Sequence, residues 1–193
     1  MSIIKETASG YEVLKEEDIL LTGRKIFLTS DVTSESTVRL LMQLMALDEE
    51  RHDEITIFIN SPGGDVLSGL AVYDFIKTIK SPVKTVCIGT AYSMGAILFL
   101  AGGKREVYEH SRIMIHDPSY FTNDVGGKKP HEIQLQLDKL IETRNVLAKI
   151  ISEVTGKSFE DIIKVTSEDS FYNAEEAVEF GIATAIISSN KEE

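Results

Sequence analysis

The sequence has little besides packing to hold a fold together: one cysteine, no tryptophan and only 7% aromatic residues. Cys87 has no partner within the chain, so a scaffold held by internal disulfides is excluded. Its place in the apolar run Val86-Cys87-Ile88 predicts a buried thiol. A chain of 193 residues can bury roughly 70% of the surface that it exposes when unfolded. We therefore expect one globular domain with a single hydrophobic core.

Basic residues are also scarce, since 20 lysines and arginines stand against 31 aspartates and glutamates, for a net charge of -11. Binding to a nucleic-acid backbone or to an anionic membrane surface needs a basic face, so neither partner is expected. The longest nearly apolar stretch, Met94 to Gly103, has about half the length of a membrane span and predicts a buried helix. Acidic residues at the start, Met1 to Glu6, do not suit a signal peptide and predict a cytoplasmic protein.

Short apolar runs alternate with helical patterns between residues 24 and 115, which is typical of an α/β fold. The runs expected as strands are 26–28, 55–59, 83–88, 105–108 and 112–115, with a last strand at 184–187. Little polar alternation within 55–59 indicates a strand that is covered on both faces. No repeat and no linker divides the chain into two domains.

Apolar residues at helical spacing predict the helices and the faces that they bury. After N-cap candidates at 33–36, the first face consists of Val38, Leu40, Leu41, Leu44 and Met45. A further helix is expected through Leu67, Leu70, Ala71, Phe75 and Ile79. A long helix from about His131 to Thr155, stopped by Gly156, has a stripe of Ile133, Leu137, Leu140, Ile141, Leu147 and Ile151. Two short helices are expected at 158–165 and 174–180.

Ser93 stands between the predicted strand 83–88 and the buried helix that starts at Met94, with a tight connection expected at Gly89–Tyr92. A sharp strand-to-helix turn lifts a serine above the sheet and leaves the next backbone N–H free at the helix N-terminus. Ser93 is therefore a candidate nucleophile, and the N–H of Met94 is a candidate donor to an oxyanion. The alternative is a serine that only caps the helix.

A second turn, Asn60 to Asp65, contains the pair Gly63-Gly64 and follows another predicted central strand. Paired glycines let backbone N–H groups approach a ligand closely. If the strands are parallel, both turns lie at the carboxyl edge of the sheet, where one glycine N–H and the N–H of Met94 can form a two-donor oxyanion hole. The alternative is an ordinary turn that needs glycine for a positive φ.

His116 is the candidate general base, because it directly follows the apolar strand Ile113-Met114-Ile115 and so emerges at a strand end. A carboxylate that orients the imidazole completes a Ser-His-acid arrangement. Asp169, Glu168 and Asp117 are all candidates for this acid, and their spacing does not choose among them.

Metal and nucleotide sites are not expected within this chain. The remaining histidines lie in charge-rich surroundings that are typical of solvated side chains: His52, His110 and His131. Neither His52-Asp53-Glu54 nor His131-Glu132 has the second histidine of a zinc-binding helix. The segment Gly126 to Lys129 lacks the strand-loop-helix frame of a phosphate loop.

Five motifs, in this order over about residues 24–187, resemble the proteolytic subunit of the ATP-dependent Clp serine protease. They are Arg24-Lys25-Ile26-Phe27-Leu28-Thr29; Ile59-Asn60-Ser61-Pro62-Gly63-Gly64 with Gly69 and Tyr73-Asp74; Ala91-Tyr92-Ser93-Met94-Gly95; Met114-Ile115-His116-Asp117-Pro118; and Asp169-Ser170-Phe171 with Ala174-Glu175-Glu176-Ala177 and Phe180-Gly181. The resemblance implies a serine endopeptidase with Ser93 as nucleophile, His116 as general base and Asp169 as the orienting acid. The oxyanion donors that it implies are the N–H groups of Gly64, or of Gly63, and of Met94.

The resemblance also implies an architecture and partners. The fold is a crotonase-like α/β spiral of βαβ units, with 24–193 as one serine-peptidase domain, a protruding helical handle at about 119–155, and 1–23 as an N-terminal segment in the place of the family's axial loop. Members form homo-oligomeric heptameric rings, which stack into a chamber, or mixed rings with a paralogue. They degrade unfolded polypeptides delivered by an AAA+ Clp ATPase, so the partner uses the ATP and this chain needs no cofactor.

The sequence departs from the family next to the expected site. Tyr92 replaces an alanine before the serine, Asp117 replaces a glutamine after the histidine, and Glu168 replaces an arginine associated with contact between rings. Residues 1–23 and 120–129 also differ. These departures leave a non-catalytic or regulatory subunit of a mixed ring as one alternative. A second is an enoyl-thioester hydratase on the same fold with a similar two-donor oxyanion hole, although hydration needs paired carboxylates and a pocket for a nucleotide tail.

Overall fold

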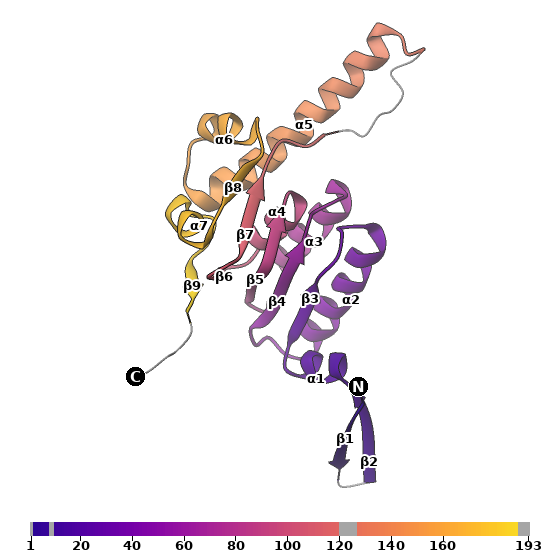
Figure 1. Cartoon of the computed structure of the whole chain (residues 1–193). Helices are drawn as coiled ribbons and strands as arrows, with labels where there is room; N and C mark the ends of the chain where they lie inside the picture. The colour runs from indigo at the N-terminus through magenta and orange to yellow at the C-terminus, as the bar shows by residue number, and fades with distance from the viewer. Residues whose placement is uncertain (1, 8–9, 120–126, 189–193) are drawn as a thin grey trace.

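The computed structural model describes residues 2–7, 10–119 and 127–188 (Figure 1). The helices of this part are α1 (Glu16–Thr22), α2 (Ser34–Glu50), α3 (Val66–Thr78), α4 (Met94–Leu100), α5 (Pro130–Thr155), α6 (Phe159–Thr166) and α7 (Ala174–Phe180). Its strands are β1 (Ser2–Thr7), β2 (Gly10–Lys15), β3 (Lys25–Leu28), β4 (Ile55–Ser61), β5 (Val83–Tyr92), β6 (Lys104–Tyr108), β7 (Arg112–Ile115), β8 (Ser170–Tyr172) and β9 (Ala185–Ile187). None of the helices in these ranges is both long enough and apolar enough to cross a membrane.

The main sheet has the strand order β3-β4-β5-β6-β9, and β7 pairs with β5 on one side and β8 on the other. All pairs in it are parallel except the antiparallel pair of β7 and β8. The alternation of strands and helices along a parallel-dominated sheet confirms the predicted α/β fold. Because β4, β5 and β7 are parallel neighbours, the chain segments that follow them meet at one edge of the sheet.

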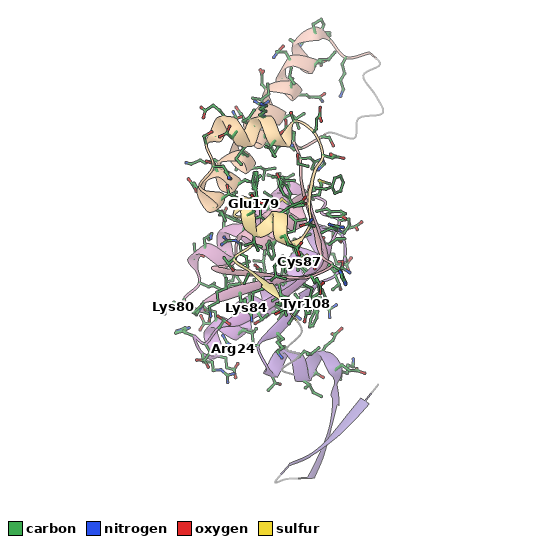
Figure 2. All side chains as sticks on the ribbon, turned by 60° about the vertical axis from the view of Figure 1, so that its left-hand side comes forward. Arg24, Lys80, Lys84, Cys87, Tyr108 and Glu179 are labelled. Atoms are coloured by element: carbon green, nitrogen blue, oxygen red, sulfur yellow. The ribbon has the colours of Figure 1, made fainter. Side chains whose placement is uncertain are left out.

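Helix α4 lies at the centre of the core, and all seven of its residues are buried, as its apolar composition predicts. Cys87 on β5 is fully buried as well, and Figure 2 shows it inside the body of the molecule while Lys80 lies at the margin. The nucleophile candidate Ser93 therefore leads into the most enclosed element of the fold.

The predicted buried face of α2 is partly wrong. Leu40 and Leu44 are buried, but Val38 and Met45 are 54% and 50% exposed. The helix instead buries Thr37, Leu40, Leu44 and Leu47. Apolar residues occur on more than one side of this helix, so periodicity alone selects a face that is rotated from the true one.

The set predicted for α3 is also only partly right, because Leu67 is 78% exposed and Ala71 is exposed, whereas Leu70, Phe75 and Ile79 pack against the core. The buried residues of α3 are Gly69, Val72, Tyr73 and Ile76. A Cβ atom at Gly69 would collide with the side chain of Met94. The glycine therefore allows α3 to approach α4 closely, and this contact sets the rotation of the helix.

The tight connection predicted at Gly89–Tyr92 is also wrong, since β5 continues to Tyr92. Its first half pairs with β6 and its end, Thr90 to Tyr92, pairs with β7. A Cβ atom at Gly89 would lie 2.6 Å from Oδ1 of Asn60, the atom that accepts a 2.9 Å hydrogen bond from the N–H of Thr90. Gly89 thus serves a close approach between neighbouring strands, and the chain turns only at Ser93.

Helix α5 projects from the body of the molecule (Figure 1) and stops before Gly156 as predicted, and this C-cap glycine has a left-handed φ of 72°. Of its predicted stripe, Leu147 and Ile151 are buried, whereas Ile133 and Leu137 are 41% and 47% exposed. The stripe therefore packs on the core near the C-terminal end of the helix and is exposed on the surface of the chain near the N-terminal end. Residues 120–126, which belong to the predicted handle, lie outside the described residues.

Some elements at the two ends of the chain were not predicted. Strands β1 and β2 form an antiparallel hairpin that is followed by α1, so the segment 1–23 contains regular structure. Strand β8 has only three residues, too few for a periodic pattern, and it pairs with β7 with Ser170 opposite Ile115. The short helices α6 and α7 and the strand β9 confirm the predictions for the end of the chain.

Candidate active site

Ser93 occupies a strained turn between β5 and α4. Its φ of 52° and ψ of -120° are unusual for a residue other than glycine. The turn is held by its backbone, because the N–H of Ser93 donates to the carbonyl of Met114 at 2.8 Å and its own carbonyl accepts from Ala96 and Ile97. Ser93 stands at the N-cap position, yet its side chain makes no capping hydrogen bond. The hydroxyl is thus available for another partner, which argues against a purely capping serine.

That partner is His116. Its Nε2 atom lies 2.8 Å from Oγ of Ser93, within hydrogen-bond distance. On the other side of the ring, Nδ1 lies 3.0 Å from Oδ1 of Asp169. The side chain of His116 is 27% exposed and that of Asp169 is 62% exposed. The structure therefore brings these three predicted residues into one continuous chain of polar contacts.

The register of the sheet explains which acid reaches the histidine. Ser170 of β8 lies opposite Ile115 of β7 in an antiparallel pair. Asp169, directly before Ser170, is therefore next to His116, directly after Ile115. Asp117, a second candidate, accepts a 2.7 Å hydrogen bond from the Thr166 hydroxyl through Oδ1. Asp169, and not Asp117, contacts Nδ1 of His116, a choice that the sequence left open.

The glycine turn after β4 meets the turn at Ser93. A Cβ atom at Gly63 would lie 2.8 Å from Cβ of Ser93 and 2.9 Å from the backbone nitrogen of Met94. The two turns thus touch at the carboxyl edge of the sheet, as the parallel arrangement predicts. Met94 begins α4, so its N–H has no acceptor one turn earlier within that helix.

Two glycine N–H groups are candidates for the second donor, and their surroundings differ. The N–H of Gly63 donates to Oγ of Ser61 at 3.2 Å. Gly64 forms a parallel bridge with Val32, in which Val32 donates to the carbonyl of Gly63 and accepts from the N–H of Asp65. In such a bridge the N–H of Gly64 itself is directed away from Val32. This arrangement favours Gly64 over Gly63 as a donor to a ligand.

Asp65 anchors the far end of the glycine turn. It is the N-cap of α3, and its Oδ1 accepts a 2.8 Å hydrogen bond from the backbone N–H of Ser68. Hydrogen bonds from the Ser68 hydroxyl and backbone hold the pKa of the Asp65 carboxyl below its usual value. The turn is therefore held between strand pairing with Val32 on one side and a charged helix cap on the other.

A narrow cavity of about 20 Å³ adjoins Ser93 and His116. Its other polar lining comes from Asp117, Thr166 and Arg144, and Arg144 lies on α5. Sequence reasoning missed Arg144. A signal was present, because positions 144, 147, 148 and 151 are spaced as one face of a helix and the last three are buried in the core.

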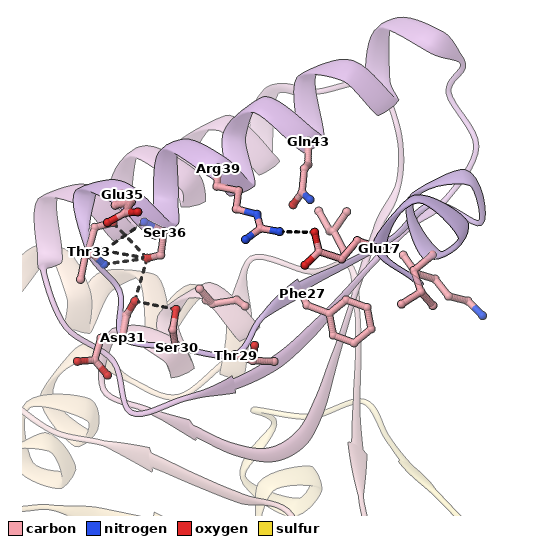
Figure 3. Close-up of a pocket in the computed structure, with 14 residues that line it drawn as sticks. Glu17, Phe27, Thr29, Ser30, Asp31, Thr33, Glu35, Ser36, Arg39 and Gln43 are labelled. Atoms are coloured by element: carbon pink, nitrogen blue, oxygen red, sulfur yellow. Dashed lines mark hydrogen bonds and ion pairs between the residues drawn. The ribbon is translucent and has the colours of Figure 1, made fainter. Parts of the chain in front are cut away.

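A wider groove of about 720 Å³ lies between α1, β3 and α2, and no predicted site residue lines it (Figure 3). Its polar contacts include an ion pair of 2.6 Å between Arg39 and Glu17, both exposed. Within the described residues, no group of three His, Cys, Asp or Glu side chains is placed to hold a metal ion. The candidate active site is therefore the one around Ser93, where a serine, a histidine and an aspartate are in contact.

Comparisons with known proteins show the family of this chain. The Clp protease family model matches residues 8–190. The chain is 38% identical over 193 residues to the ATP-dependent Clp protease proteolytic subunit 2 of Chlamydia pneumoniae, covering 98% of this chain and 93% of that one. It is 41% identical over 175 residues to subunit 3 of Synechococcus sp. (strain CC9605), covering 88% and 84% of the two chains. It is 38% identical over 190 residues to subunit 1 of Prochlorococcus marinus (strain MIT 9312), covering 96% and 94%. The predicted resemblance is confirmed, and the chain belongs to the Clp protease family.

Proposed function

We propose that this chain is a serine endopeptidase subunit of an ATP-dependent Clp protease, with Ser93, His116 and Asp169 as its catalytic residues. One observation carries the proposal, namely the chain of contacts from Ser93 Oγ to His116 at 2.8 Å and from His116 to Asp169 at 3.0 Å. Nucleophile, base and orienting acid within such reach of one another form the arrangement needed for acyl transfer.

The reaction follows from the positions of these atoms. Oγ of Ser93 attacks the peptide carbonyl while Nε2 of His116 accepts the hydroxyl proton, and the carboxylate of Asp169 stabilises the imidazolium that forms. The N–H groups of Met94 and Gly64 stabilise the oxyanion. His116 then returns the proton to the leaving amine as the C–N bond breaks. In the second half, His116 takes a proton from water, the hydroxide attacks the acyl-enzyme, and Ser93 recovers its proton.

The assembly belongs to the same proposal. Residues 24–193 form one peptidase domain with a handle at about 119–155, and 1–23 form an N-terminal segment. Exposed apolar side chains on α5, among them Ile133, Leu135 and Leu137, suit contact with another subunit in heptameric and stacked rings. Relatives are numbered as subunits 1, 2 and 3, which supports a mixed ring with a paralogue. An AAA+ Clp ATPase in the cytoplasm would supply unfolded polypeptide and use the ATP, so this chain itself requires no cofactor.

Labelling with a fluorophosphonate that reacts with activated serines tests the chemistry. We expect one adduct on Ser93, located by mass spectrometry, and no adduct on the Ser93→Ala variant. The experiment is run with and without a paralogous subunit and a Clp ATPase, so that a site activated by a partner is also detected. Absence of label under all these conditions would falsify the competent triad and favour a regulatory subunit.

Native mass measurement tests the chamber separately. A particle of seven or fourteen chains, alone or with a paralogue, agrees with the proposal. A monomer in every mixture contradicts enclosed proteolysis, even if Ser93 is labelled.

A further inference from the structure

Two aromatic rings from different strands are in contact close to the proposed triad. Tyr92 is the last residue of β5, directly before Ser93, and Phe171 is the middle residue of β8. Their ring centroids are 5.7 Å apart at an interplanar angle of 89°, which is an edge-to-face arrangement. Such pairs contribute free energy beyond the area that they bury. Strands β5 and β8 are separated by β7 in the sheet, so this contact joins two strands whose backbones do not pair.

The two rings lie on one face of the sheet, on either side of Met114. Tyr92 is opposite Met114 in the parallel pair of β5 and β7, and Met114 is opposite Phe171 in the antiparallel pair of β7 and β8. Residues in register point to the same face, so these three side chains share a face. Ile113 and Ile115 flank Met114 and are buried in the core on the opposite face. The aromatic pair therefore lies on the face that is turned away from these two core residues.

The contact between His116 and Asp169 is on the same face as the aromatic pair. His116 comes two residues after Met114, and Asp169 comes two residues before Phe171. Side chains two positions apart in extended chain point to the same side, and the 3.0 Å between Nδ1 of His116 and Oδ1 of Asp169 agrees with this placement. The aromatic contact and the contact of the acid thus join β8 to the rest of the sheet at adjacent positions.

The other side-chain contacts of β8 are made on its opposite face. The hydroxyl of Ser170 donates to a carbonyl of α6 at 2.8 Å, and the ring of Tyr172 packs on Phe180 with centroids 4.9 Å apart. By the alternation of a strand, Ser170 and Tyr172 point away from the face that carries Phe171. Phe171 is 57% exposed, and its ring contact within the described residues is with Tyr92. The ring of Tyr92 is therefore placed to hold β8 from the side of the triad.

We propose that Tyr92 is a positioning residue for Asp169. Its ring holds Phe171, and with it the three-residue strand β8, against the sheet, so that the carboxylate of Asp169 stays within reach of His116. Tyr92 thus adjoins the nucleophile in the sequence but supports the acid at the other end of the triad. The inference rests on the proposed peptidase function and adds to it a residue that keeps the triad assembled.

Replacements of Tyr92 test the proposal in the assembly that cleaves peptides. Tyr92→Ala should lower kcat by about tenfold, the largest change in an equilibrium that one aromatic pair supports, and should leave KM within about twofold. Tyr92→Phe keeps the ring and should keep kcat within about twofold. Tyr108→Ala is the matched control, because Tyr108 is a 45% exposed tyrosine at the end of the neighbouring strand β6 and makes no ring contact within the described residues. It should leave kcat unchanged.

A double-mutant cycle separates support of the acid from a general loss of structure. Tyr92→Ala should slow fluorophosphonate labelling of Ser93 by about tenfold in the unaltered background, but by less than about twofold in the Asp169→Asn background, where the acid is already absent. A ring that supports the turn at Ser93 instead would slow labelling equally in both backgrounds. Equal losses in the two backgrounds, or a loss of kcat in Tyr92→Phe as large as in Tyr92→Ala, overturn the inference.

Hydrogen exchange gives a measurement that does not depend on activity. The amides of residues 168–172, followed by mass spectrometry, should exchange about tenfold faster in Tyr92→Ala than in the unaltered protein or in Tyr92→Phe, because β8 opens more often. Equal exchange in all three proteins contradicts the inference. Absence of fluorophosphonate labelling in the unaltered protein under every partner condition overturns the proposed function instead, and the exchange rates then still decide whether Tyr92 holds β8.

Discussion

The nucleophile end and the acid end of the proposed triad are held in different ways. Ser93 sits between β5 and a helix whose residues are all buried, and Gly63 packs against it so closely that no side chain fits between them. Asp169 stands before the three-residue strand β8, and its side chain is 62% exposed. The core therefore determines the position of the serine, while a short strand pairing at the margin of the sheet determines that of the acid.

The comparison separates two kinds of dependence. The positive φ of Ser93 persists because surrounding packing outweighs its strain, so its geometry changes only if the core changes. The contact between His116 and Asp169 involves an acid whose side chain is mostly exposed, and an interaction with an exposed charge is weak and is screened by salt. A partner that binds or displaces the region around β8 can thus change the position of Asp169 without moving Ser93.

The largest expected loss of activity is at the nucleophile end. Ser93→Ala should lower kcat for peptide cleavage by about 10⁶-fold, because no other group replaces the attacking Oγ. The melting temperature and the particle mass should stay unchanged, since the hydroxyl makes no capping contact. Fluorogenic peptide cleavage and native mass measure the two outcomes, with Ser34→Ala on an exposed site of α2 as control. A particle that dissociates would show that Ser93 is structural.

Removing the charge at the acid end should lower the activity less. Asp169→Asn should lower kcat by about 10⁴-fold, because the amide no longer stabilises the imidazolium or fixes the ring tautomer. Glu168→Gln removes a charge one position away and should leave kcat within about twofold if that residue has no part in the site. Steady-state kinetics under identical assembly conditions measure both variants. Equal losses would contradict the assignment of Asp169.

Gly63→Ala tests how far packing positions the nucleophile. The new Cβ would lie 2.8 Å from Cβ of Ser93 and 2.9 Å from the nitrogen of Met94, at a φ of 96°. We expect kcat to fall by about 10²-fold through displacement of the turn. Gly127→Ala is the matched control, because Gly127 also has a positive φ, 79°, but has no atom within 4 Å of the added Cβ. Similar losses in both variants would mean that backbone strain alone is responsible.

The smallest effect is expected at the cap of the glycine turn. Asp65→Ala should lower the free energy of unfolding by about 1 kcal/mol at pH 7 and leave kcat nearly unchanged. The folded-state pKa of Asp65 is below its unfolded value, so the stabilisation from its charge is present above about pH 3.9 and is lost as the pH falls through the folded pKa.

Urea unfolding of the unaltered protein, Asp65→Ala and Asp65→Asn at pH 7 and at lower pH measures this effect. Asp65→Asn is the control, because asparagine keeps a capping oxygen but does not titrate. We expect the stability difference between the unaltered protein and Asp65→Asn to shrink as the pH falls through the folded pKa. A difference that stays constant with pH would show that the charge of Asp65 has no part in holding the turn.

The buried end could be predicted from the sequence because its signals are local. A strand, a serine and a wholly apolar helix follow one another directly, and the histidine follows an apolar strand at once. The position of the turn before α4 was predicted too early in the chain. Gly89 suggests the end of a strand, but it is a glycine because the side chain of Asn60 leaves no room for a Cβ atom there. The rotation of α3 was missed because Leu67 is apolar and exposed, whereas Gly69 marks the contact with α4.

The residue at the acid end could not be predicted from local sequence, because its choice depends on tertiary structure. Asp169, Glu168 and Asp117 are equivalent by spacing, and only the pairing of Ser170 with Ile115 selects among them. The resemblance pointed to Asp169, but physical reasoning from the sequence did not. Arg144 was missed because a charged residue on a long helix is usually solvated, and its burial depends on how α5 crosses the site.

Cys87 provides the molecule with a built-in reporter. The chain has one thiol, it is fully buried in β5, and burial raises its pKa, so a thiol reagent can react only when that strand opens. Because β5 ends directly before Ser93, the rate of thiol modification measures how often the support of the nucleophile opens. A partner that changes peptidase activity without changing this rate acts through the region of Asp169, and one that raises the rate acts through the core.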